Sequence, residues 1–416
     1  MNKVRTYAVG FELNSDTSQI SIYSEKEKDA IPLPSKTGST EGRFPTALFK
    51  RAGSDEWFAG IEAGYFEHVE KGTSVRHLLT KAESGSTQLI DGKRYTGQEL
   101  LAEYFRAALR MLGTEDAASA VSRICVTGRT VHEAFADAVH QALSLLGFKP
   151  EQILIAAYDE CFYRYVYAQK PELWTRGSLL LEVTEDDVTA SRMTEYRVRK
   201  PAYVKMEELG QAALPRDASD RDRAFSKAVR EWTGGKSFSS IFLSGRGFGR
   251  EWAKESLPIL MKSSSKIFAG DNLYLKGACL IAEKFAEGNG ADERIFDGSE
   301  SLKASLSIDA SDKGKPAVLT LLKAGENRFL AGTECELILG DVSFLLFVLT
   351  SYPDGKRRTV RMDLDGLPNR PPRATRIGLS VKMTDRTHAA IHATDLGFGD
   401  LYPASMKEWH SVLELV

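Results

Sequence analysis

One order of predicted strands and helices occurs twice in this chain, and that repeat limits the fold more than any other feature. Hydrophobic periodicity predicts the order β-β-β-α-β-α-β-α in residues 1–170 and again in residues 175–287. Strands that alternate with helices are typical of a covered, largely parallel sheet. We therefore predict two α/β halves, the first of which carries an inserted subdomain of short elements at about residues 35–95.

The first half gives the clearest local signals. Its opening strands form a hairpin, and Thr96 with Glu99 makes a capping-box pattern at the start of a helix that Gly113 ends. The predicted strands are residues 5–13, 18–24, 29–34, 123–127 and 152–156, and the predicted helices are 96–112, 131–146 and 159–168.

The second half repeats this order with little inserted sequence. Asp271 is expected to cap its last helix, and Gly277 with Ala278 allows that helix to approach the sheet closely. The predicted strands are residues 178–183, 188–193, 196–204, 240–243 and 267–268, and the predicted helices are 220–232, 250–261 and 273–286.

The sequence changes character after a linker at residues 288–300. Short alternating or apolar runs separated by turn signals favour an antiparallel, β-sandwich-like domain in residues 301–416. The tail is expected to pack back through Tyr402 and Trp409. The predicted strands are residues 302–308, 317–322, 334–339, 343–349, 358–364, 376–383 and 388–394.

Charge and hydropathy argue against two classes of partner. The chain has 416 residues and a formal net charge of −2, which gives no electrostatic reason to expect nucleic acid or an anionic membrane surface. No apolar run approaches the roughly 20 residues that span a bilayer, and the N-terminus runs into a strand without an apolar signal core. We therefore expect a cytoplasmic protein.

The cysteines and histidines show no metal-site spacing. The seven histidines are scattered, and the four cysteines lie apart from one another among apolar residues. Buried free thiols in a reducing compartment are the expected state of Cys125, Cys161, Cys279 and Cys335.

Polar residues follow the first strand of each half. Glu12 ends the first strand of the chain, and the turn after it carries hydroxyls and backbone amides that can face an anion. Glu182 occupies the matching position in the second half, and a later strand leads into the turn Gly245-Arg246-Gly247.

On these motifs, residues 1–287 resemble the actin-like ATPase superfamily, with a layout similar to the nucleotide-binding domain of DnaK-type chaperones. The whole chain also resembles an uncharacterised bacterial family that joins such a domain to a β domain. The resemblance implies duplicated, ribonuclease-H-like halves around a cleft that binds ATP with Mg²⁺, and it implies Glu12 and Glu182 as the residues near the metal. The implied cofactor-binding residues are Glu12, Asn14, Ser15, Thr17, Glu182, Thr184, Gly245, Arg246 and Gly247.

Each motif departs from the family pattern. Glu12 stands for an aspartate and Asn14 for a glycine in the first phosphate loop, so longer side chains enter the space of the phosphates. The second loop, residues 182–187, has no glycine and carries acids that repel phosphate. In the segment that joins the halves, Ala157 occupies the position of an acid, and in the adenosine loop Arg246 replaces one of two glycines.

Three functions remain open on this basis, and no catalytic residue is assigned. The first is a degenerate or weak nucleotide binder that acts as a chaperone-like or scaffold protein and engages a protein partner through its β domain. The alternatives are a slow ATPase of DnaK-like type and a small-molecule kinase of the same superfamily. Basic residues at 356–358, with Arg370 and Arg373, are a candidate docking site for an acidic partner.

Overall fold

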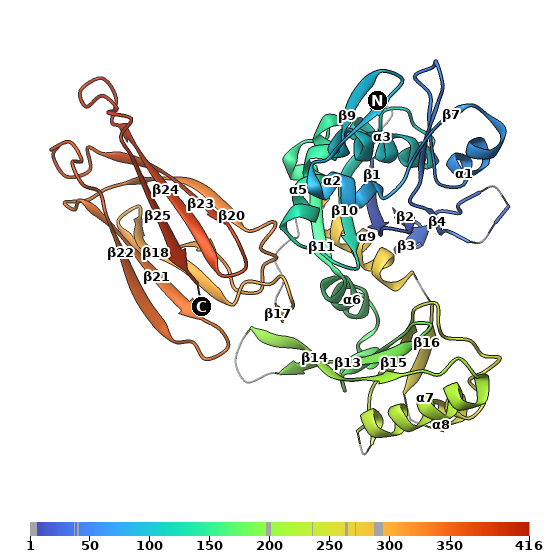
Figure 1. The fold of residues 1–416 in the computed structure, drawn as a ribbon. Helices are drawn as coiled ribbons and strands as arrows, with labels where there is room; N and C mark the ends of the chain where they lie inside the picture. Colours follow the sequence, from blue (N-terminus) through green and yellow to red (C-terminus); the bar gives the residue numbers. More distant parts are fainter. Residues whose placement is uncertain are drawn as a thin grey trace. The chain divides into compact units, whose positions relative to one another are not determined.

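The computed structural model describes residues 6–36, 38–39, 41–196, 201–234, 236–262, 265–270, 272–286 and 294–415. The chain is a mixed α/β protein with several sheets. It divides into two compact units (Figure 1). The N-terminal unit comprises Met1–Tyr196 and Val204–Asp292, and the C-terminal unit comprises Arg197–Tyr203 and Glu293–Val416.

The first large sheet of the N-terminal unit is built around the opening hairpin. Across the sheet the order is β11 (Ile153–Ala157), β10 (Val121–Gly128), β1 (Tyr7–Leu13), β2 (Thr17–Ser24) and β3 (Asp29–Pro32). Strands β1, β10 and β11 are parallel, whereas β2 and β3 pair antiparallel. The sheet is therefore mixed, because the opening hairpin supplies its antiparallel side.

The second large sheet has the same strand order. Within this unit it runs β16 (Lys266–Ala269), β15 (Ser240–Ser244), β12 (Ser178–Val183), β13 (Asp187–Tyr196) and β14 (Ala202–Ala213). Strand β12 pairs parallel with β15 and antiparallel with β13, as β1 does with β10 and β2. Each sheet thus has its own first strand at the centre.

Helices cover both faces of the first sheet. Phe11 packs edge-on against Phe105 of α3 (Gly97–Leu109), with ring centroids 4.9 Å apart. Its neighbour Gly10 faces α9 (Leu273–Ala286), where an added Cβ would lie 2.6 Å from the carbonyl oxygen of Leu275. Because successive residues of a strand point to opposite faces, α3 and α9 lie on opposite sides of the sheet.

Helix α6 (Tyr158–Tyr167) contacts both sheets. The thiol of Cys161 lies 3.4 Å from the hydroxyl of Thr127 in β10, and the ring of Phe162 meets Phe242 of β15 edge-on at 5.4 Å. The other face of the second sheet is covered by α7 (Ala218–Thr233) and α8 (Ser256–Lys262), which share its core and lie side by side in Figure 1. Helix α5 (Glu133–Leu145) packs beside α3.

The predicted insertion contains more regular structure than its irregular sequence indicates. It forms a small sheet, a hairpin and two helices. Its elements are β4 (Phe44–Pro45), β5 (Leu48–Arg51), β6 (Trp57–Ala59), α1 (Gly60–Val69), β7 (Gly72–Val75), α2 (Leu78–Ser84), β8 (Thr87–Ile90) and β9 (Lys93–Thr96), and α4 (Ala117–Ala120) precedes β10.

The C-terminal unit contains two four-stranded antiparallel sheets that share one hydrophobic core. This confirms the antiparallel pairing expected for this part. Strand β17 (Arg294–Asp297) precedes both sheets and lies inside the predicted linker. One sheet runs β19 (Lys315–Leu322), β18 (Ala304–Asp312), β21 (Phe344–Ser351), β22 (Arg357–Asp363), and the other runs β20 (Gly332–Ile338), β23 (Arg376–Met383), β24 (His388–Gly397), β25 (Glu408–Glu414).

Several element boundaries differ from the predictions. The third strand of the second half was expected at residues 196–204, but β14 lies at Ala202–Ala213. The predicted helix 250–261 is wrong at its start, because the Asp222 carboxylate accepts hydrogen bonds from the backbone of Glu255 (2.6 Å) and Ser256 (3.0 Å), where α8 begins. The predicted cap Asp271 lies outside the described residues.

Two predictions about single side chains have different outcomes. The cysteines are free, and three of them are buried as expected, whereas Cys335 is half-buried. Arg370 was predicted to face a partner, but its guanidinium makes a paired contact with the fully buried Asp395, at 2.7 and 2.8 Å. Arg370 therefore belongs to the interior of the C-terminal unit.

Candidate functional site

Glu12 lies at the end of β1 with both carboxylate oxygens engaged by the protein. Oε1 accepts hydrogen bonds from the Tyr158 hydroxyl (2.6 Å) and the Asn14 amide (3.1 Å). Oε2 accepts one from the Gln19 amide (2.9 Å), and the residue is 3% exposed. Three donors therefore balance this carboxylate without an ion.

A pair of stacked tyrosines lies beside Glu12. Tyr158 begins α6 and Tyr274 lies in the first turn of α9, and their rings are nearly parallel, with centroids 3.8 Å apart and planes 8° from each other. Burial raises the pKa of each hydroxyl far above its ordinary value, and the charge of Glu12 raises the pKa of Tyr158 further. Both hydroxyls therefore remain protonated, which makes Tyr158 a permanent donor to Glu12.

Glu182 occupies the equivalent position at the end of β12. Burial raises the pKa of its carboxyl group, while the Tyr274 hydroxyl and the charge of Arg129 act in the opposite direction. The Tyr274 hydroxyl is close enough to influence Glu182 but makes no hydrogen bond of ordinary geometry to the described residues. The two strand-end acids thus each face one tyrosine of the stacked pair.

The remaining residues of the first hairpin turn separate into two roles. The Asn14 side chain accepts a hydrogen bond from the backbone of Arg129 at 2.8 Å, which ties the turn to the end of β10. Ser15 is exposed, and Thr17 accepts a hydrogen bond from the Arg246 guanidinium at 3.0 Å. Arg246 therefore connects the turn after β15 to the first hairpin.

The turn between β12 and β13 closes on itself. The Thr184 hydroxyl donates to the Asp187 carboxylate at 2.7 Å and accepts from the Asp187 backbone at 3.0 Å. Its backbone carbonyl and that of Glu185 each accept a hydrogen bond of 2.6 Å from Arg221, which sequence reasoning did not single out. The Arg221 guanidinium therefore fixes the turn, and the polar groups of Thr184 named above already have protein partners.

Gly245 and Gly247 serve the packing of the protein backbone. A Cβ on Gly245 would lie 2.3 Å from the carbonyl oxygen of Val183, and its φ of +91° also disfavours other residues. A Cβ on Gly247 would lie 1.7 Å from the carbonyl oxygen of Thr184. Both glycines are therefore explained by the close approach of two protein turns.

An open cleft of about 910 Å³ lies beside these turns. Of the predicted site residues, Thr17, Gly245 and Arg246 line it, together with Arg43 and Arg250, which the motif analysis missed. Acidic Glu41 and Glu251 also line it. The structure thus gathers the predicted residues into an interior group around Glu12 and an outer group around Arg246.

The predicted magnesium ligands do not form part of a larger ligand cluster. In the part of the chain that the structure describes, one group of three or more His, Cys, Asp or Glu side chains has ligand atoms within 4.8 Å of one another, and it lies in the C-terminal unit. Glu12 and Glu182 as metal ligands remain a prediction. None of the described helices is long and apolar enough to cross a membrane.

Two family models match different parts of the chain. No curated protein matches the chain. A model for a domain of unknown function (DUF8552) matches residues 301–415. A model for the C-terminal part of a family of unknown function (DUF5716) matches residues 30–298, which is more than half of the chain. The chain therefore belongs to the DUF5716 C-terminal family.

Proposed function

We propose that this protein is an actin-like protein that does not hydrolyse ATP and that acts as a scaffold, in a chaperone-like manner, for a protein partner. The shared strand order of the two large sheets supports the actin-like relationship, because each sheet has its first strand at the centre and its second and third on one side. The proposal depends on what lies between the central strands of the two sheets.

The stacked pair Tyr158 and Tyr274 carries the proposal. In the resemblance, the acids that end the two central strands face the metal and the phosphates. Here Glu12 faces Tyr158, and Glu182 is close enough to Tyr274 for each to shift the pKa of the other. Two rings with centroids 3.8 Å apart leave no room between them for a phosphate. The centre of the domain is therefore stabilised by aromatic stacking in place of a ligand.

ATP with Mg²⁺ fits these residues poorly. A magnesium site needs ionised oxygens that are free to hold water around the metal. Glu12 already accepts three hydrogen bonds, and burial raises the pKa of Glu182. Glycines that would let backbone amides approach phosphate face protein carbonyls instead. We therefore derive no hydrolytic step.

A weaker form of ligand binding is favoured by the outer cleft. Arg43, Arg246 and Arg250 line it, and guanidinium groups bind phosphate and stack on bases. Non-hydrolytic binding of a nucleotide there is compatible with the scaffold function. No observation favours a small-molecule kinase.

An exposed apolar loop supports engagement of a partner by the C-terminal unit. Between β24 and β25, Phe398, Leu401 and Met406 are 45%, 87% and 61% exposed. Large apolar side chains gathered on one loop are typical of a contact surface. In a pull-down with the full chain, we expect Leu401→Asp to abolish binding of a protein partner without lowering the melting temperature. Val318→Asp, on an exposed part of β19, is the control and is expected to preserve binding.

Phosphate release and thermal shift test the proposal together. The full chain with ATP and Mg²⁺ is expected to release no phosphate above background, and Glu12→Gln to leave the thermal shift with ATP unchanged. Binding to the folded state raises the melting temperature. If ATP raises the melting temperature of the wild type but not that of Arg246→Glu, the nucleotide binds in the outer cleft. Magnesium-dependent phosphate release that Glu12→Gln abolishes would overturn the proposal, and Glu25→Gln, the same change at an exposed acid after β2, is the control.

A further inference from the structure

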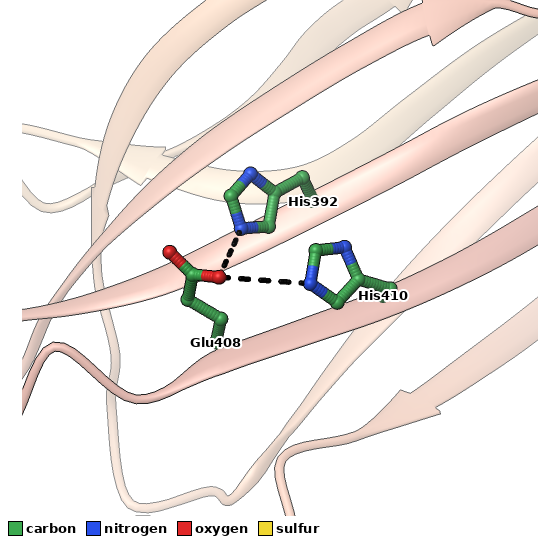
Figure 2. A group of neighbouring side chains, drawn as sticks. All are labelled: His392, Glu408 and His410. Carbon is green, nitrogen blue, oxygen red and sulfur yellow. Dashed lines mark ion pairs between the residues drawn. The ribbon is translucent and has the colours of Figure 1, made fainter.

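Two histidines and a glutamate lie together on the outer face of a sheet in the C-terminal unit (Figure 2). His392 lies on β24, and Glu408 and His410 lie on β25. In the antiparallel register His392 is directly opposite His410, and Thr394 is opposite Glu408. The alternate residues of these strands enter the core, so the three polar side chains share the opposite face.

Two of the three distances between their ligand atoms are close to those of ligands around one small cation. Nε2 of His392 lies 3.5 Å from Oε2 of Glu408, and Nε2 of His410 lies 3.7 Å from the same oxygen. These distances are too long for good hydrogen bonds. Nitrogen and oxygen ligands that are about 2.0–2.2 Å from a tetrahedral Zn²⁺ ion are themselves about 3.3–3.5 Å apart.

The hydrogen bonding of His392 gives a second reason to expect a ligand. Its Nε2 atom is shielded from solvent and has no hydrogen-bond partner among the described residues. A shielded polar atom without a hydrogen bond is unfavourable unless another interaction satisfies it. A cation held between His392, Glu408 and His410 supplies that missing interaction.

The two imidazole rings must adjust slightly to share one ion. They are stacked, with centroids 4.4 Å apart and planes 7° from each other, whereas two ligands of one ion must point at it from different directions. The His410 side chain is 69% exposed and can therefore tilt towards His392 without disturbing the core. Strand pairing fixes the backbone of both residues, which limits the adjustment to side-chain rotation.

We propose that His392, Glu408 and His410 form a surface site for a divalent transition-metal ion, with Zn²⁺ as the ion that fits best. Imidazole ligands favour Zn²⁺ over Mg²⁺ and Ca²⁺, which prefer all-oxygen sites. Three protein ligands leave one position of a tetrahedral ion for water. A hollow of about 580 Å³, which His392 and Thr394 help to line, gives solvent access to this face.

The site links the last two strands of the sheet. Strand β25 is at the edge and pairs with β24 alone in this sheet. An ion bound by side chains of both strands therefore stabilises the pairing of β25.

Titration of the chelator-treated full chain with Zn²⁺ alone tests the site. We expect His410→Ala and His392→Ala each to lower the affinity for one Zn²⁺ ion at least about tenfold, since even the loss of a supporting contact around a metal costs about 10–100-fold. His388→Ala, on the same strand but paired with Asp385, is the matched control and keeps full affinity. Mg²⁺ at the same concentration is expected to leave the protein unchanged.

Co²⁺ supplies a spectroscopic readout that does not depend on stability. The wild-type chain is expected to give the visible absorption of tetrahedral Co²⁺, and His410→Ala to lose it. Since His410 is exposed, its variant keeps the fold, which an unchanged melting temperature in chelator verifies. Equal Zn²⁺ affinity and equal Co²⁺ absorption in the wild type, His392→Ala and His410→Ala would overturn the site.

Discussion

At the scale of single residues, the two tyrosines of the stacked pair differ in the hydrogen bonding of their hydroxyl groups. The Tyr158 hydroxyl donates to Glu12 at 2.6 Å, whereas the Tyr274 hydroxyl has no hydrogen bond of ordinary geometry to the described residues. The rings themselves are equivalent partners in one stack. Removing each hydroxyl in turn keeps the stacked rings, so the two variants compare the contribution of the Glu12 hydrogen bond to the free energy of unfolding with that of a hydroxyl without one.

We expect Tyr158→Phe to lower the free energy of unfolding by about 1.5–3 kcal/mol, the usual contribution of a hydrogen bond to a charged group. Tyr274→Phe removes a buried hydroxyl that lacks such a bond, so it is expected to cost less than about 1 kcal/mol. Urea denaturation of both variants measures the difference. Equal losses would show that the Glu12 hydrogen bond contributes nothing specific.

A second residue-scale prediction concerns the buried pair Arg370 and Asp395. The Arg370 guanidinium and the hydroxyl and backbone of Ser405 hold the pKa of Asp395 well below its ordinary value. A depressed folded-state pKa stabilises the protein fully above about pH 4, the unfolded value. That stabilisation decreases as the pH falls below pH 4 and is lost once the pH passes the folded-state pKa.

We therefore expect Asp395→Asn to lower the free energy of unfolding of the C-terminal unit at pH 7 by about 3–5 kcal/mol, because it leaves Arg370 buried without its counter-charge. The difference from the wild type is expected to shrink as the pH is lowered from 4 towards 2. Asp363→Asn, which breaks an exposed pair with Arg361, is the control and is expected to cost at most about 1 kcal/mol. A pH-independent difference for Asp395→Asn would contradict the assignment.

At the scale of elements, the crossing of α6 and α9 depends on one small residue. A Cβ on Gly277 would lie 2.0 Å from the carbonyl oxygen of Cys161 in α6. The sequence predicted that Gly277 allows a close approach, but it predicted the sheet as the neighbour. The closest neighbour is a second helix, and Gly10 of β1 supplies the close approach to the sheet.

Gly277→Ala is expected to destabilise the N-terminal unit by about 1–3 kcal/mol, because two packed helices must separate to admit a methyl group. Gly64→Ala is the matched control, since Gly64 lies within α1 and has open space around its Cα. There alanine is expected to stabilise by about 0.4–1 kcal/mol through its better helix propensity and smaller unfolded-state entropy. Changes of the same sign in both variants would exclude a steric role for Gly277.

Elements with strong local signals were predictable, and those set by distant contacts were not. The capping box of Thr96 and Glu99 is present at the start of α3, and β12 has its predicted bounds. By contrast, α1 buries two small residues, Gly60 and Ala63, so it has no apolar stripe to detect. The start of α8 depends on a carboxylate from α7, which no local pattern reveals.

The candidate site shows the same division. The strand-end positions of Glu12 and Glu182 follow from hydrophobic periodicity, and both residues lie where the pattern predicted. The contact between Tyr158 and Tyr274 joins residues 116 positions apart and exists through the packing of α6 against α9. Periodicity describes neighbours within an element, so it contains no information on such a pair.

At the scale of the whole molecule, each unit has a hydrophobic core of its own. Phe347 lies in the core that both sheets of the C-terminal unit share, and Phe225 lies in a core of the N-terminal unit. Both side chains are fully buried. Because a core unfolds cooperatively within its own unit, a chain with separate cores is expected to unfold in more than one step.

We expect calorimetry of the full chain to resolve two transitions. Phe347→Ala is expected to destabilise one unit by about 3–5 kcal/mol, the usual cost of truncating a buried phenylalanine, and thereby to lower one transition. Phe225→Ala, with the same chemical change, is expected to lower the other. Zn²⁺ is then expected to raise the transition that Phe347→Ala lowers, because His392 and His410 lie in that unit. A single transition that both variants lower equally would mean that the two units unfold as one, and stability could then not be assigned to either unit alone.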